Sequence, residues 1–339
     1  MRPRLVDVAE LAGTSKPIAS RALNRDPTLA IGSELRERIR SAAETLGYQP
    51  HAAARSLRRS AAGAIGLLIP DLTNPAYALI IRGAFTRAAE RGFVVLLLED
   101  RNGQGVDVAV AELVLAVRID ALIVASAFPG HPLFPVLDEL AIPHVFGNRA
   151  VAGSSRNVTL DDAVASALAV DYLADLGHRS VAHISGPLDL DPALRRATGF
   201  SERAAERGLQ AISVEAPGFL EHGGADAAAR LLEQHPEVTG VYTSSVSQAA
   251  GLLHVAGRLG IEVPDDLSVV AYADTPLADV LMPALSAVSM PFAELGAACV
   301  DAVIAQGEGR EPQDIVVETA PSIVARSSAG PPRVRVARG

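Results

Sequence analysis

Residues 5–24 read LVDVAELAGTSKPIASRALN, and this stretch decides the fold of the N-terminal region. Apolar residues recur at helical spacing before Gly13, where a backbone with positive φ comes at little steric cost. Ser15 is a favoured N-cap for a second helix, and Pro17 is tolerated in that helix's first turn because no intrahelical N–H is needed there. The pattern predicts two helices joined by a tight turn, a helix–turn–helix.

The second of these helices is predicted to turn a polar face outward. Ile18, Ala22 and Leu23 supply its apolar contacts, whereas Lys16, the only lysine of the chain, falls outside them. In a helix–turn–helix the outer face of this helix contacts base edges in the major groove of DNA. We therefore favour DNA recognition over a helical hairpin with a solvated charged face. The candidate DNA-contacting residues of the stretch are Thr14, Ser15, Lys16, Pro17, Ser20, Arg21 and Asn24.

The charge of the chain is polarised. Residues 1–60 contain eleven lysine or arginine and six aspartate or glutamate side chains, a net charge of +5. Because the whole chain of 339 residues carries −9, the remainder carries −14. The phosphate groups of a nucleic acid would therefore be attracted to the N-terminal region alone.

Two further helical segments follow the first pair. A helix is predicted over residues 33–46, where Ser33 gives a start signal and Gly47 ends the apolar periodicity that would close a three-helix core. The segment HAAARSLRRS at 51–60 is too short to be a stable helix alone, and it carries arginines on either side of the large apolar Leu57.

Several longer stretches then follow one another in a recognisable order. After VDVAELAG come ERIRSAAETLGYQPHAAARSL and IGLLIPDLTNP, and downstream come RIDALIV (118–124), LADLGHRSVAHISGP (173–187), GRLGIEVPDDLSVVAYAD (257–274) and PALSAVSMPFAELG (283–296). In these motifs and over nearly its whole length, the chain resembles the LacI/GalR family of bacterial transcriptional regulators.

The resemblance implies how the N-terminal region would bind DNA. In the family the second helix enters the major groove, which puts Lys16, Pro17 and Arg21 at base-reading positions, and a lysine or arginine there favours guanine. The family's hinge helix inserts a leucine into the minor groove, and the matching residue is Leu57. A wedge of this kind unstacks a base step and is offset by the DNA bend that it permits. Its neighbours Arg55 and Arg58 would lie near the DNA backbone.

The rest of the chain alternates strand-like apolar runs with amphipathic helical stretches. The runs are 64–70, 93–100, 121–126, 144–147, 180–186, 240–245 and 267–273. This alternation predicts parallel sheets covered on both faces. With the resemblance, it predicts an N-terminal all-α helix–turn–helix head plus hinge helix, then a two-lobed, periplasmic-binding-protein-like α/β effector domain. The chain would cross between the lobes near 158–162, 287–292 and 317–321.

The expected domain boundaries follow from these elements. The head takes residues 1–47, the hinge 48–61, and the effector-binding and dimerisation domain 62–339. Within that domain the first lobe takes 62–159 and 291–318, the second lobe 160–288 and 320–329, and the tail 330–339.

Candidate effector contacts lie just after the predicted strands, because ligands of parallel sheets bind at the carboxyl ends of strands. Arg196 matches the family arginine that grips ligand hydroxyls or carboxylates. Phe219 and Phe292 either supply apolar faces to a ligand or belong to the core. The candidates are Asp71, Tyr77, Asn148, Arg196, Phe219, Ser245, Asp274 and Phe292.

Four positions, at three places in the sequence, depart from the family's pattern. Ser245-Val246 replaces a common Asn-Asp, Ala273 replaces a common aspartate, and Asn148 replaces a common acid. A buried hydroxyl left without a partner costs about 1–3 kcal/mol, so an ordinary hexose would fit poorly. We therefore expect an effector that is less hydroxylated or more anionic than a simple sugar, held chiefly by Arg196. The alternative is that the chain has lost any small effector.

Signals for other classes of protein are missing from the sequence. Neither a G-x-S-x-G elbow nor an ordered triad predicts an enzyme, the eight histidines are too scattered to predict a metal site, and no cofactor is expected. The single Cys299 lies in an apolar stretch, where we expect it to be buried and inert. The start MRPRLVDVAE is charged, which favours a cytoplasmic protein over the alternative of a secreted solute-binding protein. No apolar run of membrane length is present.

The oligomeric state follows from the geometry of the expected DNA complex. A three-helix head covers one half-site, so we expect a homodimer on a near-palindromic operator. The tail from Ser327 contains Pro-Pro and no heptads, so a tetramer-forming coiled coil is not expected. We expect a repressor in which a small effector, a sugar or related metabolite, changes the closure of the lobes. A coupling of about 1–3 kcal/mol between the effector and DNA would suffice.

Overall fold

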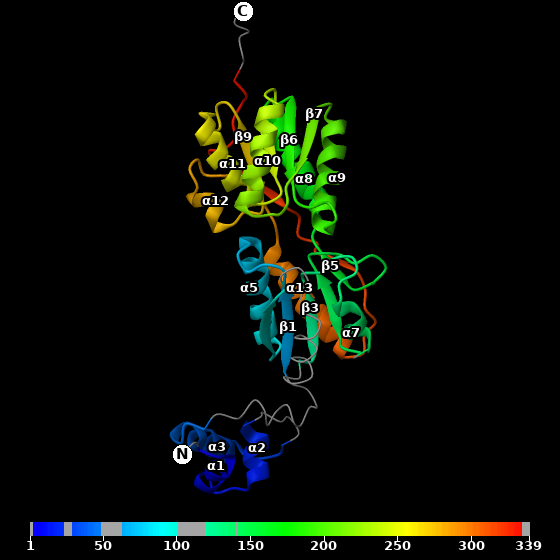
Figure 1. Cartoon of the computed structure of the whole chain (residues 1–339). Helices are drawn as coiled ribbons and strands as arrows, with labels where there is room; N and C mark the ends of the chain where they lie inside the picture. Colours follow the sequence, from blue (N-terminus) through cyan, green and yellow to red (C-terminus); the bar gives the residue numbers. More distant parts are fainter. Residues whose placement is uncertain (1–2, 24–28, 49–62, 101–118, 140, 334–339) are drawn as a thin grey trace, which may run out of the picture. The chain divides into compact units, whose positions relative to one another are not determined.

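The computed structural model describes residues 3–23, 29–48, 63–100, 119–139 and 141–333 (Figure 1). The chain divides into two compact units, Met1–Gly63 and Ala64–Gly339.

The first unit is a bundle of three short helices. They are α1 (Leu5–Leu11), α2 (Lys16–Leu23) and α3 (Ser33–Thr45). The predicted turn is confirmed, because Gly13 has a φ of 63°. Ala9, Ala19 and Ile39 are buried together in the small core where the three helices meet. Helix α3 begins at Ser33, one residue earlier than a Ser33 cap would require, because its N-cap is Gly32.

The second unit contains two six-stranded sheets, each of which forms one lobe. The sheet of the first lobe has the order β11-β5-β4-β3-β1-β2, and the sheet of the second lobe has the order β12-β10-β9-β8-β6-β7. The first comprises β1 (Ala64–Ile69), β2 (Val94–Glu99), β3 (Ala121–Val124), β4 (His144–Gly147), β5 (Asn157–Thr159) and β11 (Ile315–Val316). The second comprises β6 (Ser180–Ser185), β7 (Gln210–Glu215), β8 (Gly240–Thr243), β9 (Ser268–Tyr272), β10 (Ser286–Ser289) and β12 (Ser322–Val324). Every strand pairing in them is parallel except that of β10 with β12.

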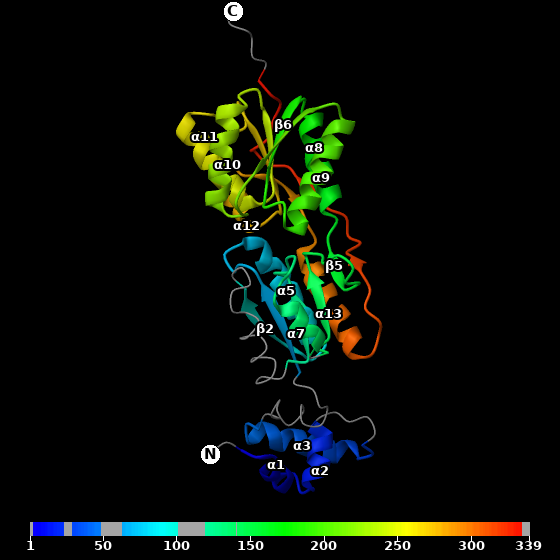
Figure 2. The same cartoon turned by 45° about the vertical axis from the view of Figure 1, so that its right-hand side comes forward.

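Helices cover both sheets. The first lobe carries α5 (Pro75–Glu90), α7 (Leu133–Glu139) and α13 (Phe292–Gly307). The second carries α8 (Asp162–Asp175), α9 (Asp191–Glu206), α10 (Glu221–Gln234), α11 (Val246–Leu259) and α12 (Pro276–Val280). Figure 2 shows α8 and α9 on one face of the second sheet and α10 and α11 on the other. This is the arrangement that a parallel sheet with buried faces requires.

The paired helices approach each other closely at glycines. A Cβ added to Gly83 of α5 would lie 1.9 Å from the carbonyl oxygen of Ala293 in α13. A Cβ added to Gly199 of α9 would lie 2.6 Å from Cα of Ala163 in α8. At both places any side chain larger than hydrogen would push two backbones apart.

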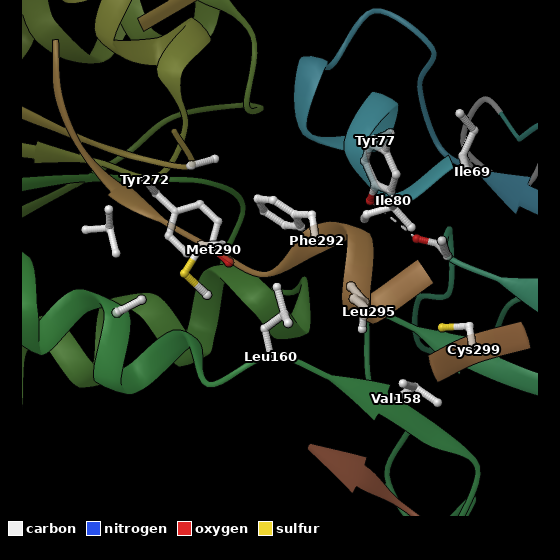
Figure 3. Close-up of a cluster of buried hydrophobic side chains, with 14 of the residues drawn as sticks. Ile69, Tyr77, Ile80, Val158, Leu160, Tyr272, Met290, Phe292, Leu295 and Cys299 are labelled. Atoms are coloured by element: carbon white, nitrogen blue, oxygen red, sulfur yellow. Dashed lines mark hydrogen bonds between the residues drawn. The ribbon is translucent and has the colours of Figure 1, made fainter. Parts of the chain in front are cut away.

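The two lobes share a continuous core where the chain passes between them. Strand β5 leads into α8 of the second lobe, β10 leads back into α13 of the first, and β11 leads to β12. Leu160 and Met290, which lie on two of these passages, are buried in one cluster with Tyr272 and Phe292 (Figure 3). The lobes therefore hold a common apolar centre rather than a polar linker.

The predicted helical head and two-lobed α/β domain are confirmed, whereas the predicted hinge helix lies outside the described residues. All seven apolar runs named from the sequence contain strands. The sequence reading missed the edge strand β7 and the short strands β5, β10, β11 and β12. In β7 exposed and half-buried residues alternate, so the strand lacks the continuous apolar run that marks the central strands.

Candidate functional site

The outer face of α2 is polar and accessible. Ser15, Lys16 and Pro17 are exposed, whereas Ala19 and Ala22 of the same helix are buried in the bundle. Thr14, Ser20 and Arg21 are partly exposed. The other candidate DNA contacts, Asn24, Arg55, Leu57 and Arg58, lie outside the described residues.

A pocket lies in the second unit, at the carboxyl ends of strands from both lobes. It holds about 500 Å³ of space when the solvent at its open mouth is counted. Six predicted effector residues line it: Tyr77, Asn148, Arg196, Phe219, Ser245 and Phe292. Figure 3 shows Tyr77, from the first lobe, and Tyr272, from the second, on either side of Phe292.

The two predicted carboxylates do not line this pocket. Asp71 accepts hydrogen bonds from the backbone and side chain of Thr73, at 2.7 and 2.6 Å, and so shapes the loop after β1. Asp274 forms an ion pair with Arg326, at 2.8 Å. Both positions follow strands, but their side chains already have partners within the protein.

Arg196 is a buried cation whose charge is matched. It is 5% exposed, its Nε lies 2.7 Å from Oδ1 of Asp162, and its Nη1 donates to the carbonyl oxygen of Ser244 at 2.9 Å. Its guanidinium carbon lies 3.6 Å from the centre of the Tyr272 ring, a cation–π distance. Burial opposes the charge, but Tyr272 and Asp162 outweigh it, so the pKa of Arg196 is raised.

Asn148 directly follows β4 and lines the pocket, and its backbone has a conformation that few residue types adopt. Its φ is 68°, a left-handed value that asparagine tolerates better than most residues. Its amide nitrogen donates to the hydroxyl of Tyr77 at 3.4 Å, while its Oδ1 is buried with no hydrogen-bond partner in the described part of the chain. This oxygen is therefore an unused acceptor at the pocket wall.

Ser245 and Phe219 form the wall of the second lobe. The Ser245 hydroxyl caps α11 by accepting from the backbone N–H of Gln248 at 3.0 Å, and it donates to the carbonyl oxygen of Phe219 at 2.5 Å. The Phe219 ring lies so close to Gly186 that a Cβ there would be 2.3 Å from it. Ser245 thus acts on the pocket by holding the backbone of Phe219.

Arg149 is a pocket residue that the sequence analysis missed. It is 8% exposed, and its Nη1 donates to the carbonyl oxygens of Ser126 and Ala127, at 3.2 and 3.5 Å. Its Nε is buried, and no described residue forms a hydrogen bond with it. Its position shortly after the buried strand β4 was the available signal.

Two hydrogen bonds hold the lobes together beside the pocket. Arg195 of α9 donates to the carbonyl oxygen of Asn148 at 2.9 Å, and Asp191 of α9 accepts from the backbone N–H of Ala150 at 2.9 Å. Arg195 also pairs with Asp162 at 2.8 Å. The start of α9 therefore reaches across to the loop after β4.

The remaining titratable groups have structural roles. Burial lowers the pKa of His183 to about 3, and it stacks on Tyr242 with ring centres 5.1 Å apart. Cys299 is buried as expected, and burial raises its pKa to about 12. Among the described residues, no group of three or more metal-binding side chains converges, and no helix is long and apolar enough to cross a membrane.

One buried cluster contains the residue types of a catalytic triad, in a different arrangement. Asp100 accepts from the hydroxyl of Ser126 at 2.7 Å and lies 2.6 Å from Nε2 of His131. His131 Nδ1 accepts from the backbone N–H of Leu133 at 3.1 Å. Because the serine donates to the carboxylate and not to the histidine, the histidine does not activate it as a nucleophile.

Comparisons with known proteins agree with both units. Residues 4–51 match the family "Bacterial regulatory proteins, lacI family", and residues 170–329 match a "Periplasmic binding protein-like domain". The ribose operon repressor of Halalkalibacterium halodurans is 32% identical over 91% of this chain and 91% of its own length. A LacI family transcriptional regulator from Mycobacterium smegmatis has a TM-score of 0.73 at 32% identity, covering 79% of this chain and 100% of that chain. The regulator CelR in complex with cellobiose has a TM-score of 0.72 at 26% identity, covering 97% and 100%.

A helix–turn–helix unit followed by a two-lobed α/β unit with a pocket at its strand ends defines a DNA-binding transcriptional regulator. The chain belongs to the LacI/GalR family of these regulators.

Proposed function

We propose that the protein is a repressor that binds a near-palindromic operator as a homodimer and is controlled by a small metabolite in the pocket between the lobes. The observation that carries this proposal is the pocket itself, which combines aromatic walls with buried, unpartnered polar atoms of Asn148 and Arg149. Polar atoms of that kind are costly to leave unpaired unless a ligand meets them. The related ribose repressor and the CelR–cellobiose complex suggest a ligand from the sugars and their derivatives.

The DNA-binding residues are assigned to the outer face of α2 and to the hinge. Exposed Lys16 and Pro17, together with Arg21, would meet base edges in the major groove. Leu57 would insert into the minor groove, flanked by Arg55 and Arg58. The head at 1–47, the hinge at 48–61 and the effector and dimerisation domain at 62–339 are the corresponding functional parts.

Catalysis is not part of the proposed function. The hydroxyl of the pocket residue Ser244 lies 2.8 Å from Nε2 of His183, but burial lowers the pKa of His183 to about 3, which makes it a weak general base. The related proteins are regulators. We propose that the protein acts in the cytoplasm, where its DNA is.

Fluorescence anisotropy with the full chain tests the role of α2. We expect Lys16→Ala to weaken binding to a specific duplex by about tenfold, the loss of one good base contact. The matched control is Arg40→Ala, which removes the same charge from α3, where Arg40 pairs with Glu37. Equal losses for the two variants would show that α2 does not read the bases and would overturn this assignment.

A further inference from the structure

Arg149 carries a buried charge that no acidic side chain of the described residues matches. The residue is 8% exposed, and its only hydrogen bonds with described residues are those from Nη1 to the carbonyl oxygens of Ser126 and Ala127. No carboxylate of a described residue lies within ion-pair distance of it. Buried charges in proteins are normally paired, because removing an ion from water is costly.

The guanidinium of Arg149 has one edge that the described residues do not use. Nη1 is occupied by the two carbonyl oxygens, so Nε and Nη2 remain, and Nε is buried without a hydrogen-bond partner among the described residues. Arg149 lines the pocket. Two parallel N–H groups on one edge of a guanidinium match the two oxygens of a carboxylate or a phosphate.

The described pocket wall contains no acidic side chain that could supply the missing charge. Its other cation, Arg196, is already matched by Asp162, at 2.7 Å. The described lining of the pocket is therefore positive by the one charge of Arg149. A neutral ligand would leave that charge uncompensated, whereas an anionic ligand would pair with it.

The same pocket also contains hydrogen-bond acceptors that a donor group on a ligand could satisfy. Within the described part of the chain, Asn148 Oδ1 is a buried acceptor without a partner, and the hydroxyl of Thr275, which is 3% exposed, has none either. Both residues line the pocket. Hydroxyl groups on a ligand would satisfy these atoms, and the rings of Phe219 and Phe292 offer apolar faces to its carbon skeleton.

We propose that the effector is a small hydroxylated organic anion, whose negative group binds the Nε–Nη2 edge of Arg149 and whose hydroxyl donates to Asn148. This inference rests on the proposed function, since it names the chemical class of ligand for the same pocket. A carboxylate and a phosphate monoester share the required chemistry. The two are separated by experiment.

Isothermal titration of the full chain with matched sugar derivatives tests the proposal. The probes are three sets, each a neutral sugar with a sugar acid and a phosphate ester derived from it: glucose, glucuronate and glucose 6-phosphate; galactose, galacturonate and galactose 6-phosphate; ribose, ribonate and ribose 5-phosphate. We expect at least one anionic member to bind at least tenfold more tightly than its neutral parent. Preference for the acid or the phosphate within that set identifies the anionic group. Binding of a neutral parent as tightly as its anions would overturn the proposal, while leaving effector control by a sugar intact.

The variant Arg149→Gln provides a second test, with Arg258→Gln, an exposed arginine of α11, as control. We expect Arg149→Gln to weaken binding of the anion at least tenfold and to leave binding of the neutral parent unchanged. Equal weakening of both would mean that Arg149 only shapes the pocket, and would overturn the proposal.

If no probe binds, the unfolding temperatures of the ligand-free parent chain and variants test the proposal. An uncompensated buried charge predicts that Arg149→Gln unfolds at a higher temperature than the parent chain, and that Arg258→Gln is unchanged. A lower unfolding temperature for Arg149→Gln would contradict an uncompensated charge at this position, and the proposal would fail. Failure of the proposed function is distinct, because it would appear as operator binding that no ligand alters.

Discussion

The guanidinium of Arg195, on the second lobe, donates a hydrogen bond to the backbone carbonyl oxygen of Asn148, on the first lobe, over 2.9 Å. The same asparagine presents its side-chain oxygen to the pocket. A ligand that binds Asn148 therefore contacts a residue already held by the opposite lobe. This relationship gives the pocket a direct physical connection to the closure of the lobes.

Removal of the hydrogen bond between Arg195 and Asn148 should weaken the contact between the two lobes. We expect Arg195→Ala to weaken effector binding by about tenfold, because binding must then supply the closure that Arg195 now supports. Titration calorimetry measures the affinity, and small-angle scattering measures the expansion of the ligand-free protein. The control is Arg203→Ala, since Arg203 of α9 pairs with Asp171 and Glu206 inside the second lobe. Identical affinities in Arg195→Ala and the parent chain would argue against a coupling role.

The ion pair of Arg196 and Asp162 should be more important for stability than its exposed counterparts. Asp162 is fully buried, so Arg196→Met leaves its carboxylate with Arg195 as the only ion-pair partner in the described chain. We expect a loss of about 3 kcal/mol in the free energy of unfolding, measured with urea. The double variant Asp162→Asn with Arg196→Met should recover part of this loss. A single variant as stable as the parent chain would show that the pair is dispensable.

The contact of α5 with α13 should not tolerate a methyl group. Gly83→Ala would place Cβ 1.9 Å from the carbonyl oxygen of Ala293, and we expect it to lower the free energy of unfolding by about 1–3 kcal/mol. Gly257→Ala in α11 is the matched control, because nothing lies within 4 Å of its Cβ position. There we expect a gain of about 0.4–1 kcal/mol, since alanine favours helix and restricts the unfolded chain. Similar results at the two positions would contradict the packing described for α5.

His183 should lower the free energy of unfolding when the solution is mildly acidified. Burial lowers its pKa from 6.5 to about 3 in the folded chain, so below pH 6.5 the unfolded chain binds the proton that the folded chain excludes. The contribution is complete above pH 6.5 and is lost as the pH falls toward 3. We expect the parent chain to lose about 1 kcal/mol more than His183→Gln between pH 7 and 5.5 in urea unfolding. Parallel losses in the two proteins would place the cause elsewhere.

Much of the fold could be predicted because its signals are local. The turn at Gly13 and the central strands could be predicted from the type and spacing of neighbouring residues alone. Strand β7 could not be found this way, because an edge strand with one exposed face has no continuous apolar run. Its existence depends on pairing with β6, which is a contact distant in sequence.

The pocket was predictable in position but not in detail. Residues that follow strands were expected to face the pocket, which is where the structure has Asn148, Phe219 and Ser245. Asp274 also follows a strand, but it pairs with Arg326, which is distant in the sequence, so the pattern around Asp274 could not predict this ion pair. The unmatched charge of Arg149 was hidden for the same reason, because pairing is a property of three-dimensional neighbours.

Selection of bound duplexes from a random DNA pool tests the central claim most directly. The full chain is used at fixed moderate salt, once without additions and once with a metabolite extract, in parallel with Lys16→Ala. The account predicts that the parent chain enriches a near-palindromic sequence with a central pyrimidine–purine step, that Lys16→Ala alters or abolishes the preference, and that the extract changes the yield of the enriched duplex. Absence of any enriched sequence under both conditions would contradict the assignment of a sequence-specific regulator.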